Sequence, residues 1–381
     1  MKIKRAYKYR LYPNNGQRVM LDKTFGCVRV VWNACVDAFN ACDTENGVKP
    51  KAVGKKELID DKPWLNEVSA ATLQQKQRDF TEFVKQYFNE RRKTKLGEPQ
   101  FQNKHQDQSF RLPNQKFNLN GNRLRLERIG WVKVVVDRPI PDSARLISCT
   151  VSKDRSGRYF ASILVEEEKY YKPRTGKTVG VDLGVKTLAT LSDGTIIENP
   201  HFLRENQARL KRAQQNLSRK QKGSRRREKC RQKIARLHRK IADKRSWYIH
   251  NLTTYLVDNY DVICIEDLNV SGMMRNHKLA GSVSDVSFSE FRRQLEYKCS
   301  WYGKELVVIN RFYPSSKTCS SCGWKNDRLT LKNRVFKCES CGMELDRDLN
   351  AAINIKAVGV EAAQRTWSGE VANRVETSKV L

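Results

Sequence analysis

Four cysteines toward the end of the chain are spaced as ligands of a metal ion. They form two Cys-x-x-Cys pairs separated by fifteen residues, and a glycine follows each pair. The residues are Cys319 and Cys322, then Cys338 and Cys341, with Gly323 and Gly342 behind them. Four thiolates at this spacing suit one tetrahedral Zn²⁺, and glycine lets each knuckle turn back toward sulfur. Because four protein ligands leave no open position, we expect a structural zinc ion. Disulfides or a redox motif are the alternatives.

Acidic residues occur where scattered surface charge is not expected. Asp182 lies inside the apolar run "VGVDLGV", Glu266 ends the run "VICIE", and Asp346 and Asp348 open a helical segment. A carboxylate in or beside a buried strand costs free energy unless it is paired or bound to a cation. Singly, these residues could form a turn, a salt bridge and a helix N-cap. Together, their order is the one by which a ribonuclease-H-like sheet gathers carboxylates around two Mg²⁺ ions.

The segments around these acids alternate between strand and helix patterns. An apolar run is followed by an alternating run, an "SDG" turn and a short strand. A polar helical hairpin over 204–246, with "KGS" at its turn, precedes the continuous apolar run "DVICIEDLNV", which is typical of a strand buried on both faces. The helix "SFSEFRRQLEYKCSWYG", the strand "KELVVIN" and the helix "DRDLNAAINIKAVGV" follow. The cysteine module interrupts this α/β pattern between its last strand and its last helix.

The first half of the chain has a different pattern. "MKIKRAYKYRLYP" alternates basic with apolar residues, which predicts a half-exposed strand that ends at Pro13. Residues 15–95 carry apolar side chains at helical spacing, and residues 106–170 return to strand patterns with the hairpin signals "NGN" and "DRSG". We therefore expect a small β-barrel into which a helical block is inserted.

The charge of the chain indicates a polyanionic partner. Its 381 residues include 73 Lys and Arg against 42 Asp and Glu, a net charge of +31. Nucleic acid is favoured over a membrane surface, because the sequence has no apolar run of about 18 residues or more and no signal peptide pattern. The other seven cysteines have no framework spacing, so we expect free thiols in a reducing cytoplasm.

The helical hairpin concentrates this positive charge. Residues 204–246 contain 18 Lys and Arg against three acids. A solvated charged face is the simpler interpretation, but so dense a charge of one sign repels itself unless phosphates neutralise it. Arg225, Arg226 and Arg227 are therefore candidate nucleic-acid contacts.

Several segments resemble the TnpB family of transposon-encoded, RNA-guided nucleases, which have a RuvC-type nuclease domain and are related to the type V CRISPR effectors. They are "GVDLGVKTLATLSDG", "IEDLNV", "RFYPSSKTCSSCG" and "CESCGMELDRDLNAAINI", with "AYKYRLYPNNGQ" and "WNACVDAFN" in the first half. The resemblance covers nearly the whole chain. It implies an α+β multidomain protein: a wedge β-barrel (1–14 and 105–172) with an inserted helical recognition domain (15–104), then an RNase-H-like RuvC nuclease domain (176–312 and 345–360) with an inserted zinc ribbon (313–344), and a flexible tail (361–381).

The resemblance also implies roles for the acids. The three catalytic acids of the family fall on Asp182, Glu266 and Asp348, which would hold two Mg²⁺ ions, and Asp346 is expected to be a cap or a supporting group. All three acids are present. This favours cleavage, because the family includes relatives that lost these acids and act as DNA-binding repressors.

The activity implied is metal-dependent cleavage of double-stranded DNA next to a short transposon-adjacent motif, guided by an RNA from the transposon end. We expect a monomeric ribonucleoprotein, prokaryotic, cytoplasmic and nucleoid-associated, that serves transposon maintenance. Transposase-type strand transfer, or a nuclease-inactive RNA-guided regulator, are the alternatives. Motif reading is expected in the helical block, where Gln74, Gln75 and Lys76 could contact base edges, although ordinary helix-surface residues would look the same.

Overall fold

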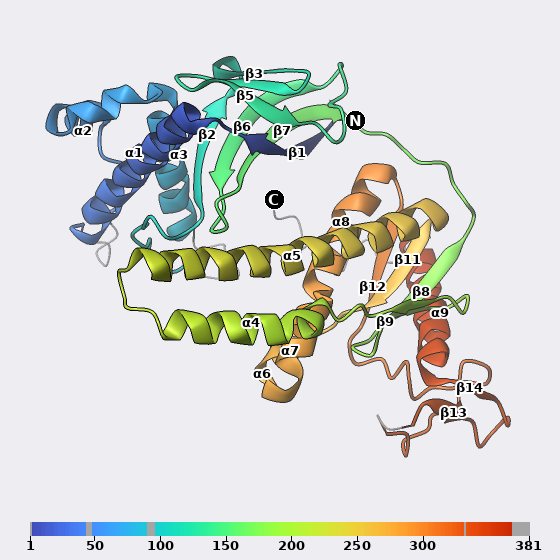
Figure 1. Cartoon of the computed structure of the whole chain (residues 1–381). Coiled ribbons are helices and arrows are strands. Elements are labelled where there is room, and N and C mark those ends of the chain that lie inside the picture. Colours follow the sequence, from blue (N-terminus) through green and yellow to red (C-terminus); the bar gives the residue numbers. More distant parts are fainter. Residues whose placement is uncertain (1, 43–47, 90–95, 331–332, 368–381) are drawn as a thin grey trace. The chain divides into compact units, whose positions relative to one another are not determined.

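The computed structural model describes residues 2–42, 48–89, 96–330 and 333–367, and it divides into two compact units (Figure 1). The first unit comprises the chain up to Glu168 together with Arg231–Arg236, and the second comprises Lys169–Cys230 and the chain from Leu237. Each unit has a large hydrophobic core of its own. Among the described residues, no helix has the length and apolar character needed to span a membrane.

The first unit is built on a seven-stranded antiparallel sheet with the order β2-β6-β7-β1-β5-β4-β3. Its strands are β1 (Lys2–Tyr12), β2 (Gln108–Pro113), β3 (Phe117–Asn120), β4 (Arg123–Leu126), β5 (Gly130–Val135), β6 (Arg145–Lys153) and β7 (Tyr159–Glu168). The predicted first strand does join the later strands, because β1 pairs with both β7 and β5. The sheet curves into a nearly closed, barrel-like layer (Figure 1).

Helices separate β1 from the rest of this sheet, as the periodicity predicts. They are α1 (Asn15–Asn40), α2 (Lys55–Asp61) and α3 (Ala70–Tyr87), with the short 3₁₀ helices η1 (Pro63–Glu67) and η2 (Asn114–Lys116). Helix α1 begins where Asn14 and Gln17 form a capping box. It packs on α3 through edge-on aromatic contacts, such as Trp32 on Phe80 with ring centres 5.7 Å apart. Two parts of the predicted helical block, 43–47 and 90–95, lie outside the described residues.

The second unit contains a five-stranded sheet with the order β10-β9-β8-β11-β12. Its strands are β8 (Thr178–Leu183), β9 (Thr187–Leu191), β10 (Ile196–Glu198), β11 (Val262–Glu266) and β12 (Glu305–Ile309). Strands β8, β11 and β12 are parallel, whereas β9 and β10 are antiparallel to their neighbours. The carboxyl ends of the three parallel strands therefore meet at one edge of the sheet.

The helices of this unit are α4 (Phe202–Ser218), α5 (Arg225–Asn259), α6 (Val270–Arg275), α7 (His277–Val286), α8 (Phe288–Tyr302) and α9 (Arg347–Trp367). Helices α5 and α8 cover one face of the sheet and α9 covers the other. In β11, Ile263 and Ile265 belong to the core that includes α5 and α8, whereas Val262 and Cys264 pack with Ile355 of α9. This two-sided burial explains why the strand reads as a continuous apolar run.

Two helix ends and two further helices differ from the sequence prediction. Helix α5 continues to Asn259, beyond the predicted end at 246, because Ile249, Leu252 and Leu256 extend its buried face. Helices α6 and α7 were not predicted. Helix α9 runs to Trp367, so the prediction of a flexible tail from 361 is wrong for 361–367, and 368–381 lie outside the described residues.

Two glycines allow α9 to lie very close to the sheet. A Cβ atom at Gly180 of β8 would collide with the backbone oxygen of Ala352 and lie 2.5 Å from the amide nitrogen of Lys356. Conversely, a Cβ atom at Gly359 of α9 would collide with the sulfur of Cys264 and lie 2.6 Å from its Cβ. The close approach of the α9 backbone to β8, and to the side chain of Cys264 in β11, is possible only because both positions lack side chains.

We expect Gly180→Ala to destabilise the second unit by about 1–3 kcal/mol or more, because helix backbone would have to move away from the strand. Gly281→Ala is the matched control: Gly281 lies in α7 and an added Cβ meets nothing within 4 Å. There the same change should be neutral or stabilise by up to about 1 kcal/mol through helix propensity. Urea unfolding of both variants checks this, and equal effects would contradict the close approach of α9.

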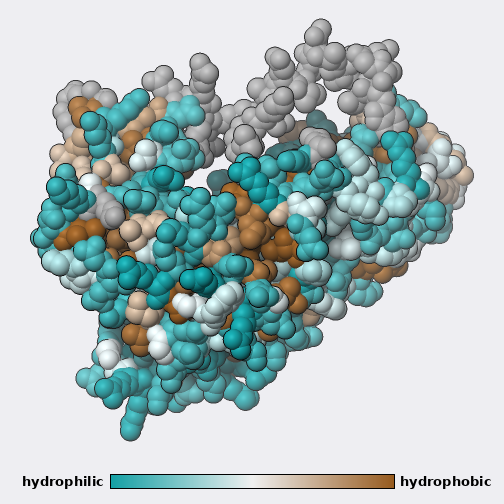
Figure 2. All heavy atoms as spheres, turned by 90° about the horizontal axis from the view of Figure 1, so that it is seen from above, coloured by the Kyte–Doolittle hydropathy of each residue, from teal (hydrophilic) through white to brown (hydrophobic). Residues whose placement is uncertain are grey.

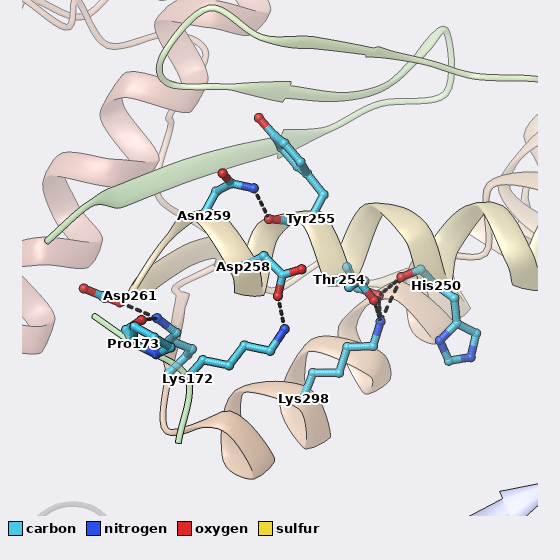
Figure 3. A network of polar contacts seen from close by, with 11 residues as sticks. Lys172, Pro173, His250, Thr254, Tyr255, Asp258, Asn259, Asp261 and Lys298 are labelled. Atoms are coloured by element: carbon cyan, nitrogen blue, oxygen red, sulfur yellow. Dashed lines mark hydrogen bonds and ion pairs between the residues drawn. The ribbon is translucent and has the colours of Figure 1, made fainter. Parts of the chain in front are cut away.

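A polar network ties the start of the second unit to its sheet (Figure 3). The ammonium of Lys304, whose side chain is 1% exposed, donates to Asp261 Oδ1 at 2.6 Å and to the carbonyl oxygen of Pro173 at 2.7 Å. Asp261 also accepts the backbone N–H groups of Thr175 and Gly176 at 2.9 and 2.7 Å. Burial raises the pKa of Asp261, but the Lys304 ammonium and these amides outweigh it and hold the pKa below its usual value.

Two further lysines belong to the same network. Figure 3 shows Lys172 reaching the carboxylate of Asp258 and Lys298 pointing at the α5 backbone. Lys298 donates to the carbonyl oxygen of His250 at 2.8 Å and to the hydroxyl of Thr254 at 2.7 Å. The network thus joins α5, α8 and the segment that leads into β8.

Lys304→Met should destabilise the protein by about 3 kcal/mol at pH 7, because it leaves a largely buried carboxylate without its cation. Since the folded-state pKa of Asp261 is depressed, its contribution is present above the unfolded value of about 3.9 and is lost as the pH falls. The gap in melting temperature between parent and variant should therefore narrow from pH 7 toward pH 3.5. Lys172→Met, at a more exposed pair, should cost at most about 1 kcal/mol. Equal losses of stability in the two variants would contradict the role of Lys304 as the cation that stabilises the Asp261 carboxylate.

Candidate functional site

Two of the predicted acids lie side by side at the carboxyl edge of the second sheet. Asp182 is in β8 and Glu266 ends β11, and these strands are parallel with Ile265 opposite Val181. The next residue on each strand is the acid, so the two carboxylates follow in the same register. Both share a strand face with Gly180 and Cys264, the face that α9 covers.

The third acid comes from the first turn of α9. Asp348 stands one turn before Ala352, the residue whose carbonyl lies over Gly180. Asp346 ends the preceding strand, and its Oδ1 accepts the backbone N–H groups of Asp348 and Leu349 at 2.9 and 3.0 Å. Asp346 is therefore the helix cap that the sequence predicts, and it fixes the backbone of Asp348.

The electrostatics link Asp182 to the other two acids. Burial, and after it the carboxylates of Glu266 and Asp348, raise the pKa of Asp182 to about 7. Burial also raises the pKa of Glu266, although a hydrogen bond from the hydroxyl of Ser315 opposes this shift. Crowded and partly desolvated carboxylates of this kind attract a cation.

Asp348 is paired with arginines. Its Oδ1 accepts Arg347 Nη2 at 2.9 Å, and its Oδ2 lies 3.8 Å from Arg334 Nη1. Within the described ranges, the three acids do not form a group whose oxygen atoms all lie within 4.8 Å of one another, whereas the four cysteines do form such a group. The structure thus brings the acids into one electrostatic site, with Asp348 held toward its neighbouring guanidinium groups.

Sequence reasoning missed the residues that support this site. Asn350 donates from its side chain to the carbonyl oxygen of Thr318 at 2.7 Å, and Asn354 donates to the carbonyl oxygens of Ser315 and Thr318 at 2.8 and 2.6 Å. Both asparagines are buried. Their spacing of four residues in an otherwise apolar helical segment was the available signal, because buried amides need partners.

The four cysteines converge as their spacing predicts. The sulfurs of Cys319 and Cys341 are 3.7 Å apart, those of Cys322 and Cys338 are 3.5 Å apart, and all four lie within 4.8 Å of one another. The two knuckles share one geometry, because Gly323 donates to the carbonyl of Cys319 and Gly342 to that of Cys338, each at 3.0 Å and each with positive φ. The pKa of Cys322 is lowered to about 7, chiefly by a hydrogen bond from the Trp324 backbone. The pKa of Cys341 is raised to about 11, because the lowering effect of the Met343 backbone is outweighed by hydrogen bonds with the neighbouring thiols.

A small hairpin joins this cluster directly to α9. Strand β13 (Val335–Lys337) pairs with β14 (Glu344–Asp346), and Phe336 of β13 is fully buried beside Cys319 and Cys338. The last residue of β14 is Asp346, the cap of α9. The cysteine cluster therefore supports the strand that delivers Asp348.

The basic hairpin is present, and its arginines have different roles. Arg225 and Arg226 at the start of α5 are exposed. The Nη1 of Arg227 instead donates to the carbonyl oxygens of Leu217 and Lys220 at 2.8 and 2.9 Å, so this side chain closes the turn between α4 and α5. Hydrophilic side chains predominate on the face shown in Figure 2, in keeping with the net charge of +31.

The candidate base-contacting residues lie on α3. Gln74 is exposed, whereas Gln75 and Lys76 are half-buried. The ammonium of Lys76 lies 4.9 Å from the centre of the Trp32 ring, and burial lowers its pKa. Of the three, Gln74 is the most accessible to a partner.

A search of solved structures identifies the architecture. A chain from "Cryo-EM structure of the Cas12f1-sgRNA-target DNA complex" matches with a TM-score of 0.50 over 93% of this chain and 99% of that chain, at 14% identity. This likeness concerns the fold. The mixed α/β architecture with its barrel-like sheet therefore resembles the fold of the Cas12f1 chain.

Sequence comparisons identify the family. The chain is 39% identical over 369 residues to the "Putative RNA-guided DNA endonuclease" of Streptomyces pristinaespiralis, which covers 95% of this chain and 90% of the relative. It is 33% identical to the "Putative RNA-guided DNA endonuclease InsQ" of Escherichia coli over 94% of this chain and 93% of that relative. The chain therefore belongs to the TnpB family.

Three family profiles match separate parts of the chain. Residues 162–277 match a profile described as "Probable transposase", which spans Asp182 and Glu266. Residues 288–355 match "Cas12f1-like, TNB domain", which spans the four cysteines and Asp348. Residues 1–39 match "Helix-turn-helix domain", and in this structure they form β1 and most of α1.

Proposed function

We propose that this chain is an RNA-guided endonuclease that cleaves double-stranded DNA next to a short transposon-adjacent motif. The observation that carries the proposal is the proximity of Asp182, Glu266 and Asp348: burial, and after it the carboxylates of Glu266 and Asp348, raise the pKa of Asp182 to about 7. The sheet order, with parallel β8, β11 and β12, supports a RuvC-type nuclease domain in the second unit. The relatives named as RNA-guided DNA endonucleases support the same activity.

The three acids suit catalytic Mg²⁺. Mg²⁺ prefers oxygen ligands such as these carboxylates. The carboxylates also repel one another, and a bound divalent cation would neutralise the negative charge that causes this repulsion. Two Mg²⁺ ions bound there would activate water and stabilise the leaving oxygen during phosphodiester hydrolysis. The chain itself orients the acids: Ser315 holds Glu266, and Asp346 fixes the backbone that carries Asp348.

The cysteine cluster suits structural Zn²⁺. Tetrahedral coordination with Zn–S bonds of about 2.3 Å requires sulfurs about 3.8 Å apart, close to the 3.7 and 3.5 Å between the two pairs. We assign the module that contains the cluster, 313–344, as the zinc ribbon. Its four thiolates would complete the coordination shell and leave the hydrolytic chemistry to the carboxylates.

The remaining parts are assigned to nucleic-acid binding. The barrel-like sheet of the first unit would be the wedge and its helices the recognition domain, with Gln74, Gln75 and Lys76 as candidate contacts. The α4–α5 hairpin would bind phosphates through Arg225 and Arg226. A guide RNA and target DNA are the partners of the Cas12f1 chain in the similar structure, and we propose the same partners for a monomeric ribonucleoprotein in a prokaryotic cytoplasm, associated with the nucleoid.

The test begins with the RNA. The protein is purified from cells that carry its transposon ends, and the RNA that copurifies is sequenced. The complex is then incubated with Mg²⁺ and a plasmid library that carries the matching sequence beside randomised flanks. Linear products at one defined offset, and only beside one flank motif, are expected. Joined strands would instead indicate a transposase, and guide-dependent binding without any cutting would indicate an inactive regulator.

A further inference from the structure

A cavity opens beside the carboxylate centre. Its volume is about 410 Å³, and Glu266 is part of its wall. Leu183, which follows Asp182, and Ile265, which precedes Glu266, also line it. Leu183 and Ile265 point to the strand face that packs with α8, opposite to the face of Asp182. The cavity therefore adjoins the carboxylate centre through Glu266, at the edge where the parallel strands end.

The cavity is lined by both apolar and polar side chains. Leu268, Val270 and Phe288 join Leu183 and Ile265 as its apolar wall, and Asn269, Ser289 and the charged residues make up its polar part, the rim. The volume lies within the range of roughly 300–1,000 Å³ that is usual for small-molecule pockets. Apolar side chains beside hydrogen-bonding groups suit a flat, heteroaromatic ligand.

The charges of the rim indicate whether the cavity would bind a phosphate or a base. Three arginines line it, and each is paired with a carboxylate: Arg292 with Asp267 at 2.5 Å and Glu296 at 3.0 Å, Arg311 with Asp267 at 2.9 Å, and Arg293 with Glu290 at 2.7 Å. Glu266 adds a further negative charge. A phosphate would meet no net positive charge here, whereas an uncharged base would find donors and acceptors together.

We propose that this cavity binds one unpaired nucleobase of the DNA strand that is being cleaved, next to the scissile phosphate. This inference rests on the proposed function and names a binding site within it. The base lies against Leu268 and Phe288, and the rim contacts its edge. Because the cavity adjoins Glu266, an inserted base fixes the position of the neighbouring phosphate at the carboxylates, as enzymes that extrude a nucleotide do.

The experiment measures cleavage of duplexes that lack single bases. The parent complex, with its copurified RNA, is given guide-matched duplexes in which abasic nucleotides replace each position across the cleavage site, under single-turnover conditions. One position within a few nucleotides of the cut should slow cleavage about tenfold or more, as expected for the loss of one stacked base. Its neighbours should have small effects.

A cavity-filling variant then tests the location. Ser289→Phe places a ring in the cavity, so it should cleave the intact duplex more slowly and should show no further slowing at the sensitive position. Ser300→Phe, an exposed serine on the same helix that is not among the residues lining the cavity, should keep the parent profile.

The outcomes separate this inference from the proposed function. A parent complex that cuts the intact duplex but shows a flat abasic profile overturns the base-binding site alone. The same holds if Ser289→Phe folds and keeps the parent profile. A parent complex that does not cut the intact duplex overturns the proposed function, and the cavity assignment with it. The abasic profile of the parent decides the question even if Ser289→Phe fails to fold.

Discussion

Asp182→Asn should reduce DNA cleavage by about three orders of magnitude or more while RNA and DNA binding stay within a fewfold of the parent. A metal-bound carboxylate supports several kcal/mol of transition-state stabilisation, and each 1.4 kcal/mol or so is a factor of ten. The measurement is single-turnover cleavage beside a filter-binding or gel-shift assay. Asp142→Asn, at an exposed aspartate of the first unit, is the matched control and should cleave normally. Normal cleavage by Asp182→Asn would refute the assignment of the catalytic centre.

The same substitution should stabilise the protein in magnesium-free buffer. The folded-state pKa of Asp182 is raised to about 7, so the stability linked to its protonation is present below the unfolded value of about 3.9 and is lost as the pH rises through 7. Asparagine keeps the shape without the charge. The melting temperature of the variant should therefore exceed that of the parent by an amount that grows from pH 5 to pH 7.5. A variant that is less stable at every pH would contradict the crowding of carboxylates.

The second large effect concerns the cysteine cluster. Cys338→Ser should lower the zinc content from about one ion per chain to near zero and should expose 313–346 to proteolysis, because structural zinc contributes folding free energy directly. Cleavage should also fall at least tenfold, since β14 would lose the core beneath it and Asp346 would no longer position α9.

Cys230→Ser separates this effect from the general loss of a thiol. Cys230 is half-buried on α5 and lies outside the cluster, so this variant should keep both zinc and activity. Elemental analysis of the purified proteins gives the zinc content, and limited proteolysis reports the local order. Full zinc occupancy in Cys338→Ser would show that the four thiolates are not one site.

Local signals made much of the site predictable. The cysteine cluster was predictable because each knuckle is built from residues that are neighbours in sequence. The two acids on strands were predictable because a carboxylate in a buried apolar run costs free energy unless it is paired or binds a cation. Asp346 was predictable as a cap for the same local reason. What could not be predicted depends on contacts between distant segments: Gly180 and Gly359 carry no turn signal, yet they set how closely α9 approaches the sheet.

Other features of α5 and α9 could not be predicted because abundant charged residues obscured the apolar periodicity and the individual roles of the arginines. The many charged residues of 204–246 predicted a helix that ends with the charge at 246. The buried face of α5 instead continues through Ile249 and Leu256. Arg227 looked like its neighbours Arg225 and Arg226, and only the structure shows that it binds the carbonyl groups of the turn. The pairing of Asp348 with Arg334 joins the cysteine module to α9 and has no sequence signature.

The absence of a linker between β14 and α9 has a consequence for engineering. Asp346 is at once the last residue of the hairpin strand and the cap of α9, so the module cannot be exchanged at that point as an independent cassette. A single inserted residue there would turn Asp348 about 100° around the helix axis. Grafts from relatives should therefore carry the segment from Ser315 through Asn354 as one piece, since the asparagines and the loop they hold must match.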